Sequence, residues 1–286
     1  MSPGQASDAG AWLRASGLAR VDALALLREL AGIGHAMLLA HPDAPLAPAT
    51  LRRLQRAAAR LHDGEPLAYV LGWREFHGLR LHVAPAVLVP RPETELLVDF
   101  ALSHLPTQAR ASVLDLGTGS GAVAIAIAAE RADARVHGVD VSADALRIAR
   151  GNARRLLPRE RAGGSLRWHQ GDWMQALPES ARDFDLIVSN PPFVAAQDPH
   201  LAALLHEPRL ALVGARAADD GLGEIRELVA QAATRLRPGG WLALEHGYDQ
   251  ARAVRSLLRR AGLTQVHTLR DLAGIGRVSA GRAHPR

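Results

Sequence analysis

The sequence predicts an α/β fold in which a mostly parallel sheet of seven strands follows a small helical domain. Two observations support this prediction. From residue 91 onwards, short apolar segments alternate with amphipathic ones, which is typical of repeated strand–helix units with helices on both faces of a sheet. Before residue 76, leucines and alanines recur at helical spacing between proline-containing breaks.

Three regions follow from these patterns. Residues 1–75 are expected to form the helical domain, with helices at 22–30 and 51–61. Residues 76–90 are expected to form a hairpin linker, because Leu79, Leu81 and Val83 alternate with polar residues before a second apolar segment at 87–89. Residues 91–286 are expected to form the α/β domain.

The α/β domain contains the periodic segments that define its order. Strands are predicted at 112–116, 135–139, 166–170, 184–189, 241–245, 264–269 and 277–280, and helices at 122–130, 143–157, 222–236 and 250–260. In sheets of this kind, ligands bind at the carboxyl ends of the parallel strands.

The composition is that of a soluble protein with a sizeable core. The 286 residues are 48% hydrophobic and 22% charged and include no cysteine, which excludes disulfides and thiolate metal sites. No apolar run reaches the roughly 18 residues that a membrane span needs, and the first ten residues lack a secretory pattern. We therefore expect a cytoplasmic, monomeric protein with no membrane association and no bound metal.

The charge is basic, with a net value of +5 and 34 basic residues, all of them arginine. Such a balance can indicate a nucleic-acid partner. The arginines are scattered along the chain instead of being concentrated in one segment, which favours a compositional bias. We expect no direct contact with nucleic acid.

A glycine-rich turn, Gly117-Thr118-Gly119-Ser120-Gly121, joins the strand at 112–116 to the helix at 122–130. Glycines at these positions let the backbone approach a ligand with no side chain in the way. Asp140 follows the next strand, where a carboxylate can accept hydrogen bonds from ribose hydroxyls. Trp173, after the third strand, can lie beside an adenine ring. The three positions together predict a nucleoside cofactor.

Two such cofactors fit the turn, NAD and S-adenosylmethionine. Gly117, Gly119 and Ala122 satisfy the permissive form of the dinucleotide fingerprint. Asp115, however, lies two residues before the first glycine, where it suits the amino acid part of S-adenosylmethionine and is poorly placed against a pyrophosphate. Asp172 also has no role in the dinucleotide fingerprint. We therefore predict S-adenosylmethionine.

The tetrapeptide Asn190-Pro191-Pro192-Phe193 follows the strand at 184–189. Its prolines stiffen the loop. The Asn190 side-chain carbonyl and the Pro191 backbone carbonyl can then both accept hydrogen bonds from one substrate NH2 group, and Phe193 offers a face for stacking. This arrangement predicts methyl transfer to a planar, conjugated nitrogen, because positioning supplies most of the catalysis when the leaving group is already good. The tetrapeptide does not distinguish an amide from an adenine.

Several stretches together resemble the HemK family of protein-(glutamine-N(5)) methyltransferases, which have a class I, Rossmann-like methyltransferase domain. The resemblance covers nearly the whole chain. The most specific part is Pro-Arg-Pro-Glu-Thr-Glu at 90–95, and the others lie at 63–69, 115–121, 190–193, 207–208 and 244–247.

The resemblance implies methylation of the glutamine side-chain amide in the Gly-Gly-Gln motif of class 1 peptide chain release factors, which would modulate translation termination. It implies cofactor binding by Gly117 to Gly121, Asp140, Trp173 and Asn190. It further implies a substrate pocket of Asn190, Pro191, Pro192 and Phe193, with Asn190, Pro191 and Phe193 as the catalytic residues. The helical N-terminal region would dock the release factor. Phe193 stands where the family usually has tyrosine, so the ring face remains and a phenolic hydrogen bond is lost.

Other interpretations remain open at this point. An adenine amino-methyltransferase acting on nucleic acid shares the logic of the tetrapeptide, but a base-reading segment is missing. A non-catalytic RNA-binding module on a decayed fold is a further alternative, disfavoured by the intact glycine turn. Arg91, Glu93 and Glu95 either form a salt-bridged hinge or also line the active site.

Overall fold

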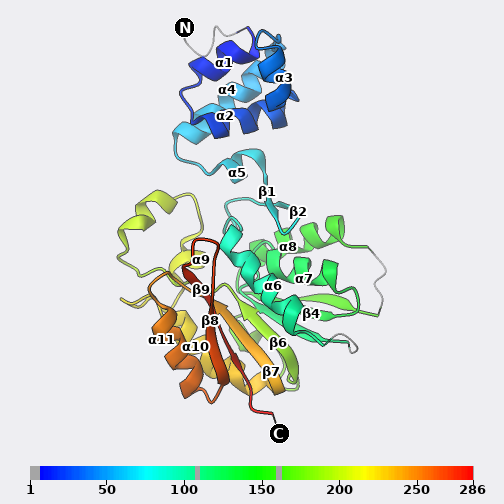
Figure 1. Cartoon of the computed structure of the whole chain (residues 1–286), viewed down its shortest axis with the longest axis vertical. Coiled ribbons are helices and arrows are strands. Elements are labelled where there is room, and N and C mark those ends of the chain that lie inside the picture. Colours follow the sequence, from blue (N-terminus) through cyan, green and yellow to red (C-terminus); the bar gives the residue numbers. More distant parts are fainter. Residues whose placement is uncertain (1–6, 107–109, 159–162, 286) are drawn as a thin grey trace. The chain divides into compact units, whose positions relative to one another are not determined.

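The computed structural model describes residues 7–106, 110–158 and 163–285. The chain divides into two compact units, Met1–Trp73 and Arg74–Arg286. The first unit is helical (Figure 1) and packs around Trp12, Leu26, Leu27 and Leu54. Its helices are α1 (Ala9–Ala15), α2 (Arg20–Leu26), the π-helical turn η2 (Leu27–Ala31), α3 (His35–Ala40), α4 (Pro48–His62) and α5 (Leu67–Leu71).

Strands β1 (Trp73–Phe76) and β2 (Leu79–His82) form a separate two-stranded sheet. His77 and Gly78 connect them with φ values of 48° and 72°, as a tight hairpin turn of this type requires. The hairpin therefore lies earlier than the range 76–90 expected from sequence. The apolar segment at 87–89, expected to belong to the hairpin linker, lies outside the hairpin. Between Pro85 and Pro90 it joins no sheet and buries Val87 and Val89.

The second unit contains a seven-stranded sheet in the order β5-β4-β3-β6-β7-β9-β8. The first five strands in this order pair in parallel, and β9 pairs antiparallel with both neighbours. The predicted mostly parallel sheet is therefore confirmed. The strands are β3 (Ser112–Leu116), β4 (Arg135–Asp140), β5 (Ser165–Gln170), β6 (Phe184–Ser189), β7 (Leu236–Glu245), β8 (Thr264–Arg270) and β9 (Gly276–Arg282).

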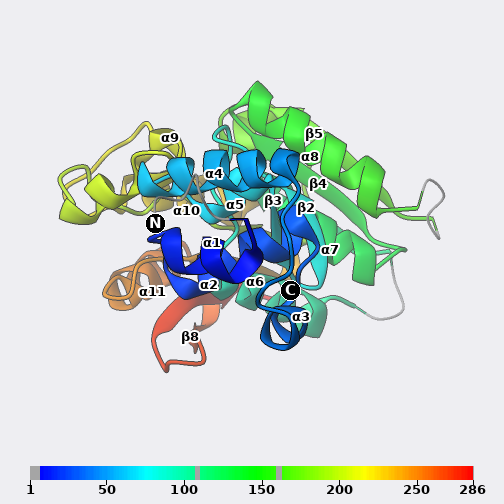
Figure 2. The same ribbon diagram turned by 90° about the horizontal axis from the view of Figure 1, so that it is seen from above.

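Helices cover both faces of this sheet. Successive strand residues point to opposite faces, so Val113 joins one apolar cluster and Leu114 the other. The first cluster packs against α6 (Glu95–His104), α7 (Ala122–Glu130) and α8 (Ala143–Leu156), and Figure 2 shows α7 and α8 beside β4 and β5. The second packs against α10 (Gly223–Ala232), α11 (Ala251–Arg260) and the turn η4 (Trp173–Ala176).

Strand β7 begins earlier than predicted. The expected helix at 222–236 ends at Ala232, and the turn η6 (Ala233–Arg235) leads directly into β7. The Pro238-Gly239-Gly240 segment therefore lies within a strand instead of ending a helix. The pairing with β6 shifts register between Phe184 and Leu186, and Gly239 adopts a φ of 77° beside this irregularity.

Three short elements complete the second unit. They are η3 (Pro92–Thr94), η5 (Pro199–Leu204) and α9 (Arg209–Val213). Within the described residues, no helix combines the length and apolar character that crossing a membrane requires.

Candidate active site

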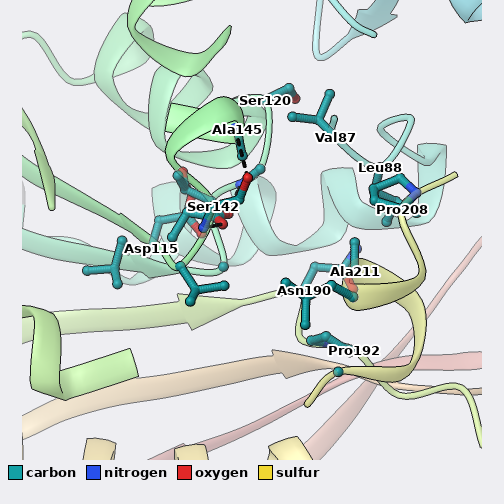
Figure 3. A pocket seen from close by; sticks show the side chains of 18 of the residues that line it. Val87, Leu88, Asp115, Ser120, Ser142, Ala145, Asn190, Pro192, Pro208 and Ala211 are labelled. Atoms are coloured by element: carbon teal, nitrogen blue, oxygen red, sulfur yellow. Dashed lines mark hydrogen bonds between the residues drawn. The ribbon is translucent and has the colours of Figure 1, made fainter. Parts of the chain in front are cut away.

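A cavity of about 510 Å³ opens at the carboxyl ends of β3, β4 and β6. Its volume is in the range of small-molecule sites. The strand order reverses at β3, which lies between β4 and β6, and such a switch point is where open α/β sheets bind ligands. Figure 3 shows lining side chains from two sides, with Asp115, Ser120, Ser142 and Ala145 on one and Asn190, Pro192, Pro208 and Ala211 on the other.

The glycine turn forms one wall of this cavity. The backbone N–H groups of Gly117 and Thr118 both donate to the Val139 carbonyl at 2.9 Å, which holds the turn against β4. Gly119 has a φ of 55°, and a Cβ added there would meet no atom within 4 Å. The backbone at Gly119 is therefore open to a ligand in the cavity.

Gly121 has a different role from the other two glycines. It does not line the cavity. It precedes α7 with a φ of 82°, and an added Cβ would lie 2.8 Å from Ile125 Cδ1 and 3.1 Å from Ala149 Cβ. This glycine therefore allows α7 and α8 to pack closely behind the turn.

Asp115 is buried at the floor of the cavity. Its carboxylate accepts hydrogen bonds from Thr118 Oγ1 at 2.6 Å and from the Ala124 N–H at 3.2 Å. Burial raises the pKa of Asp115 to about 7, although both hydrogen bonds oppose the shift. A cation in the cavity would favour the ionised carboxylate, so this position fits the charged amino acid end of S-adenosylmethionine.

Asp140 ends β4 and also faces the cavity. Its carboxylate accepts from the Gly119 N–H at 2.8 Å and the Ser142 N–H at 2.9 Å. Burial raises the pKa of Asp140, and the hydrogen bonds lower it. The two N–H groups fix the carboxylate, which retains further lone pairs for the hydroxyls of a bound nucleoside.

Trp173 packs against the glycine turn and has a backbone φ of 43°. A Cβ added at Gly117 would lie 3.4 Å from the Trp173 ring carbon Cζ3. The Trp173 Nε1 group donates to Glu224 at 2.9 Å. Glu224 also accepts from the Ala215 and Arg216 N–H groups at 2.7 and 2.8 Å. Buried Glu224 thus ties the indole to the loop before α10.

Arg216 closes this part of the wall. Its guanidinium donates to Glu224 at 3.1 Å and to both carboxylate oxygens of Asp172. The Asp172 carboxylate is therefore already bound to an arginine. Sequence reasoning missed Arg216 and Glu224, because neither belongs to a recognisable motif.

The tetrapeptide forms the facing wall. The Asn190 Nδ2 group donates to Thr94 Oγ1 at 3.1 Å, which leaves its side-chain carbonyl as an acceptor. Asn190 and Pro192 line the cavity, whereas Pro191 is buried beneath it. Phe193 does not line the cavity. Its ring packs against the second apolar cluster, and its carbonyl accepts from Gln250 Nε2 at 3.0 Å.

The conspicuous 90–95 segment lies beside the same cavity. Arg91 forms an ion pair with buried Glu207, which also accepts from the Val89 N–H at 3.0 Å. Residues on both sides of this pair, Leu88, Pro90 and Pro208, line the cavity. The Arg91–Glu207 ion pair therefore holds together the two segments that contain these lining residues.

Eight of the predicted site residues meet at one cavity. They are Gly117, Thr118, Gly119, Ser120, Asp140, Trp173, Asn190 and Pro192. In the described part of the chain, no group of three or more histidines and carboxylates is arranged to hold a metal ion. The glycine turn after β3, the carboxylate after β4 and the asparagine after β6 define a class I methyltransferase that uses S-adenosylmethionine.

Comparison with known proteins places the chain within this class. Residues 94–210 match the model of the methyltransferase small domain, and residues 7–72 match that of the PrmC N-terminal domain. The release factor glutamine methyltransferase of Burkholderia pseudomallei is 50% identical over 94% of each chain. That of Bordetella pertussis is 49% identical over 93% of this chain and 95% of its own. The chain therefore belongs to the release factor glutamine methyltransferase family.

A solved structure supports the fold independently. The chain superposes on a methyltransferase from Pyrococcus furiosus with a TM-score of 0.52 and 20% identity, covering 80% of this chain and 98% of that one. At this identity the likeness concerns the fold alone.

Proposed function

We propose that this enzyme transfers the methyl group of S-adenosylmethionine to the side-chain amide nitrogen of the glutamine in the Gly-Gly-Gln motif of class 1 release factors. The single observation that carries the proposal is the orientation of Asn190. Because its Nδ2 group is engaged by Thr94, the side-chain carbonyl is the group that Asn190 presents to the cavity. A carbonyl is the partner that a substrate NH2 group needs.

The chain's own residues act by binding and orienting. Asn190 accepts one amide N–H of the glutamine, and the Pro191 carbonyl accepts the other. These two acceptors fix the orientation of the amide nitrogen. They also polarise its N–H bonds, which raises the electron density on the nitrogen as its lone pair leaves conjugation with the amide carbonyl. S-adenosylmethionine would supply a methyl group on a sulfonium, which is a good leaving group. The glutamine nitrogen would release its proton as the new N–C bond forms and the C–S bond breaks, so no strong base is needed before attack.

Cofactor binding is assigned to the wall formed by the glycine turn. The backbone of residues 117–120 would follow the cofactor, Asp140 would accept from the ribose hydroxyls, and Trp173 would pack beside the adenine. Gly121, expected to bind the cofactor, instead packs behind the turn. Asn190 contacts the cofactor as well as the glutamine. Pro192 completes the substrate pocket, and the ring of Phe193, expected to stack on the substrate, instead anchors the tetrapeptide against the second apolar cluster.

The helical N-terminal region is assigned to docking of the release factor. Its apolar residues form a core of their own, and none of residues 7–73, the part of this region that the structure describes, lines the cavity. We further propose that the enzyme works as a cytoplasmic monomer and has no direct contact with nucleic acid.

Incubation of the enzyme with methyl-labelled cofactor and a purified bacterial class 1 release factor tests the proposal. We expect label on the release factor and none on a version whose motif glutamine is replaced by alanine. Double-stranded DNA in a parallel reaction serves as the competing substrate. Label on DNA with none on the release factor would support the adenine-methyltransferase alternative instead.

A further inference from the structure

Asn190 directly follows β6, and Glu245 ends the neighbouring strand β7 of the central sheet. Strands β6 and β7 pair in parallel, with Ser189 opposite Leu244, so the next residues along each strand are Asn190 and Glu245. Alternation along β7 directs Trp241, Ala243 and Glu245 to the face covered by α6. Thr94, at the start of α6, lies on that same face.

Three side chains lie next to one another at this point. Asn190 Nδ2 donates to Thr94 Oγ1 at 3.1 Å, and the Thr94 hydroxyl lies close enough to the buried Glu245 carboxylate to oppose the rise in its pKa. Thr94 and Glu245 are both buried, each with 4% of its surface exposed. Glu245 does not line the cavity, so its influence on bound ligands must pass through other residues.

Glu245 sets the direction of these contacts. Its ionised form, which Thr94, Arg277 and Arg91 favour, can only accept, so in that form the Thr94 hydroxyl gives its single proton to Glu245. Thr94 Oγ1 is then left as an acceptor, and only the NH2 side of the Asn190 amide can face it. The opposite face of the amide, its carbonyl oxygen, is thereby directed away from Thr94.

An amide turned by half a rotation would present NH2 to the substrate NH2 group, and two donors do not pair. The orientation of Asn190 therefore decides whether the site can bind an amide or an aniline-like nitrogen at all. Nothing in the tetrapeptide itself distinguishes the two orientations, because the carbonyl and NH2 sides of an asparagine are nearly equal in size.

The surroundings of Glu245 support a role beyond packing. Its Oε2 atom has no hydrogen-bond partner among the described residues, and a buried, half-satisfied carboxylate is costly to keep. Burial raises the pKa of Glu245 to about 7, and Glu93 adds to the shift. The hydrogen bond from Thr94 and the charges of Arg277 and Arg91 favour the ionised form.

We propose that Thr94 and Glu245 are positioning residues that lock the Asn190 amide with its carbonyl oxygen towards the substrate nitrogen. This inference rests on the proposed function for its catalytic consequence. The fixed orientation of the Asn190 amide, called the lock below, is a property of the protein alone and does not depend on the substrate. It assigns a task to residues in two of the stretches that carry the family resemblance, 90–95, where Pro90 and Thr94 line the cavity, and 244–247.

Threonine at position 94 offers a matched pair of variants. Thr94→Val keeps the shape and removes the hydroxyl, whereas Thr94→Ser keeps the hydroxyl. We expect Thr94→Val to lower turnover about tenfold, the value of one lost hydrogen bond, with a melting temperature close to that of the wild type. Thr94→Ser should keep turnover close to that of the wild type. A role in packing alone predicts the reverse order, with Thr94→Ser the more damaged variant, and that order would overturn the proposal.

A double-variant cycle tests whether Glu245 acts through Thr94. Glu245→Gln alone should lower turnover several-fold, because a glutamine can either accept from Thr94 or donate to it. In the Thr94→Val background the same change should cost less than about twofold. Full additivity of the two changes would contradict a shared pathway.

NMR of isotope-labelled protein without substrate separates this inference from the proposed function. The Asn190 side-chain NH2 protons should exchange slowly with solvent in the wild type and in Thr94→Ser, and about tenfold faster in Thr94→Val and Glu245→Gln. Equal exchange in all four proteins overturns the lock. If the lock is observed and the wild type leaves release factors unmethylated, the orientation of Asn190 stands and the proposed substrate is wrong.

Discussion

The Ser189 hydroxyl donates to the Leu116 carbonyl at 2.6 Å, and these two residues are also partners in the parallel pairing of β6 with β3. The next residue along each strand is Asn190 on one side and Gly117 on the other. Adjacent strands thus bring the glycine turn and the tetrapeptide to the same edge of the sheet. A methyl donor held by the first and an amide held by the second would meet there.

Asn190→Ala should lower turnover by at least about a hundredfold, because it removes an acceptor that the transition state uses. Asn190 is partly exposed at the end of its strand, so the fold should remain intact. Steady-state kinetics with a release factor, together with thermal unfolding, checks both expectations. Near-normal turnover in this variant would refute the assigned mechanism.

Phe193→Tyr restores the residue that is usual in the family. The partly buried Phe193 ring packs against the second apolar cluster. A tyrosine at this position would add one hydroxyl group at the edge of the ring. We expect turnover to be unchanged or mildly raised. A loss of more than about tenfold would show that the pocket has been reshaped around phenylalanine.

Cofactor binding should depend on pH through Asp115. Burial raises the pKa of this carboxyl to about 7, so the free protein holds a proton there below that pH. The cofactor carries positive charge on its sulfonium and ammonium groups, and it binds the ionised form better. Affinity should therefore rise with pH through about 7 and be lost as pH falls.

Calorimetry at pH of about 6 and about 8 measures this effect, and we expect roughly tenfold tighter binding at the higher value. Asp115→Asn is the control, since it should bind more weakly at both values and lose most of the pH dependence. Asp140 also has a raised pKa, so a slope that persists unchanged in Asp115→Asn would assign the titration to another group.

Glu224→Ala should weaken cofactor binding by about tenfold or more. The change releases the Trp173 indole N–H and two backbone N–H groups of the loop before α10. Isothermal titration with S-adenosylmethionine measures the loss. Arg226→Ala is a matched control, because this arginine on the same helix pairs with Asp220 at an exposed position away from the lining residues. It should bind the cofactor normally.

Gly119→Ala and Gly121→Ala should fail in different ways. Gly121→Ala forces a Cβ against Ile125 and Ala149 at a φ of 82°, so we expect a loss of about 1–3 kcal/mol in the free energy of unfolding. Gly119→Ala meets no atom within 4 Å and carries only the backbone strain of an alanine at a φ of 55°, so it should cost less stability than Gly121→Ala and act mainly on cofactor affinity. Chemical denaturation and cofactor titration of both variants distinguish them. Equal effects on stability would remove the distinction.

The elements that the sequence predicted best are those with local signals. Strands β3 and β6 begin and end at the predicted residues, as does α7, because apolar runs and glycine turns are encoded within a few residues. The hairpin was misplaced because its turn, His77-Gly78, is inconspicuous beside the prolines that follow. Helix α6 was not predicted at all.

The supporting side chains of the site were beyond sequence reasoning for a different reason. Thr94 contacts Asn190 across 96 positions, and Glu224 contacts Trp173 across 51. Such pairs depend on strand order and on which face a residue points to. The sequence therefore predicted eight residues that line the cavity, and the structure added buried side chains that hold them in place.

Mass spectrometry of the release-factor tip is the most direct test of the central claim. A peptide containing the Gly-Gly-Gln motif should gain the mass of one methyl group, located on the glutamine, after incubation with the enzyme and S-adenosylmethionine. The same peptide should remain unmodified with Asn190→Ala over the same time. An unmodified glutamine after prolonged incubation with active, cofactor-binding wild-type enzyme would contradict the account.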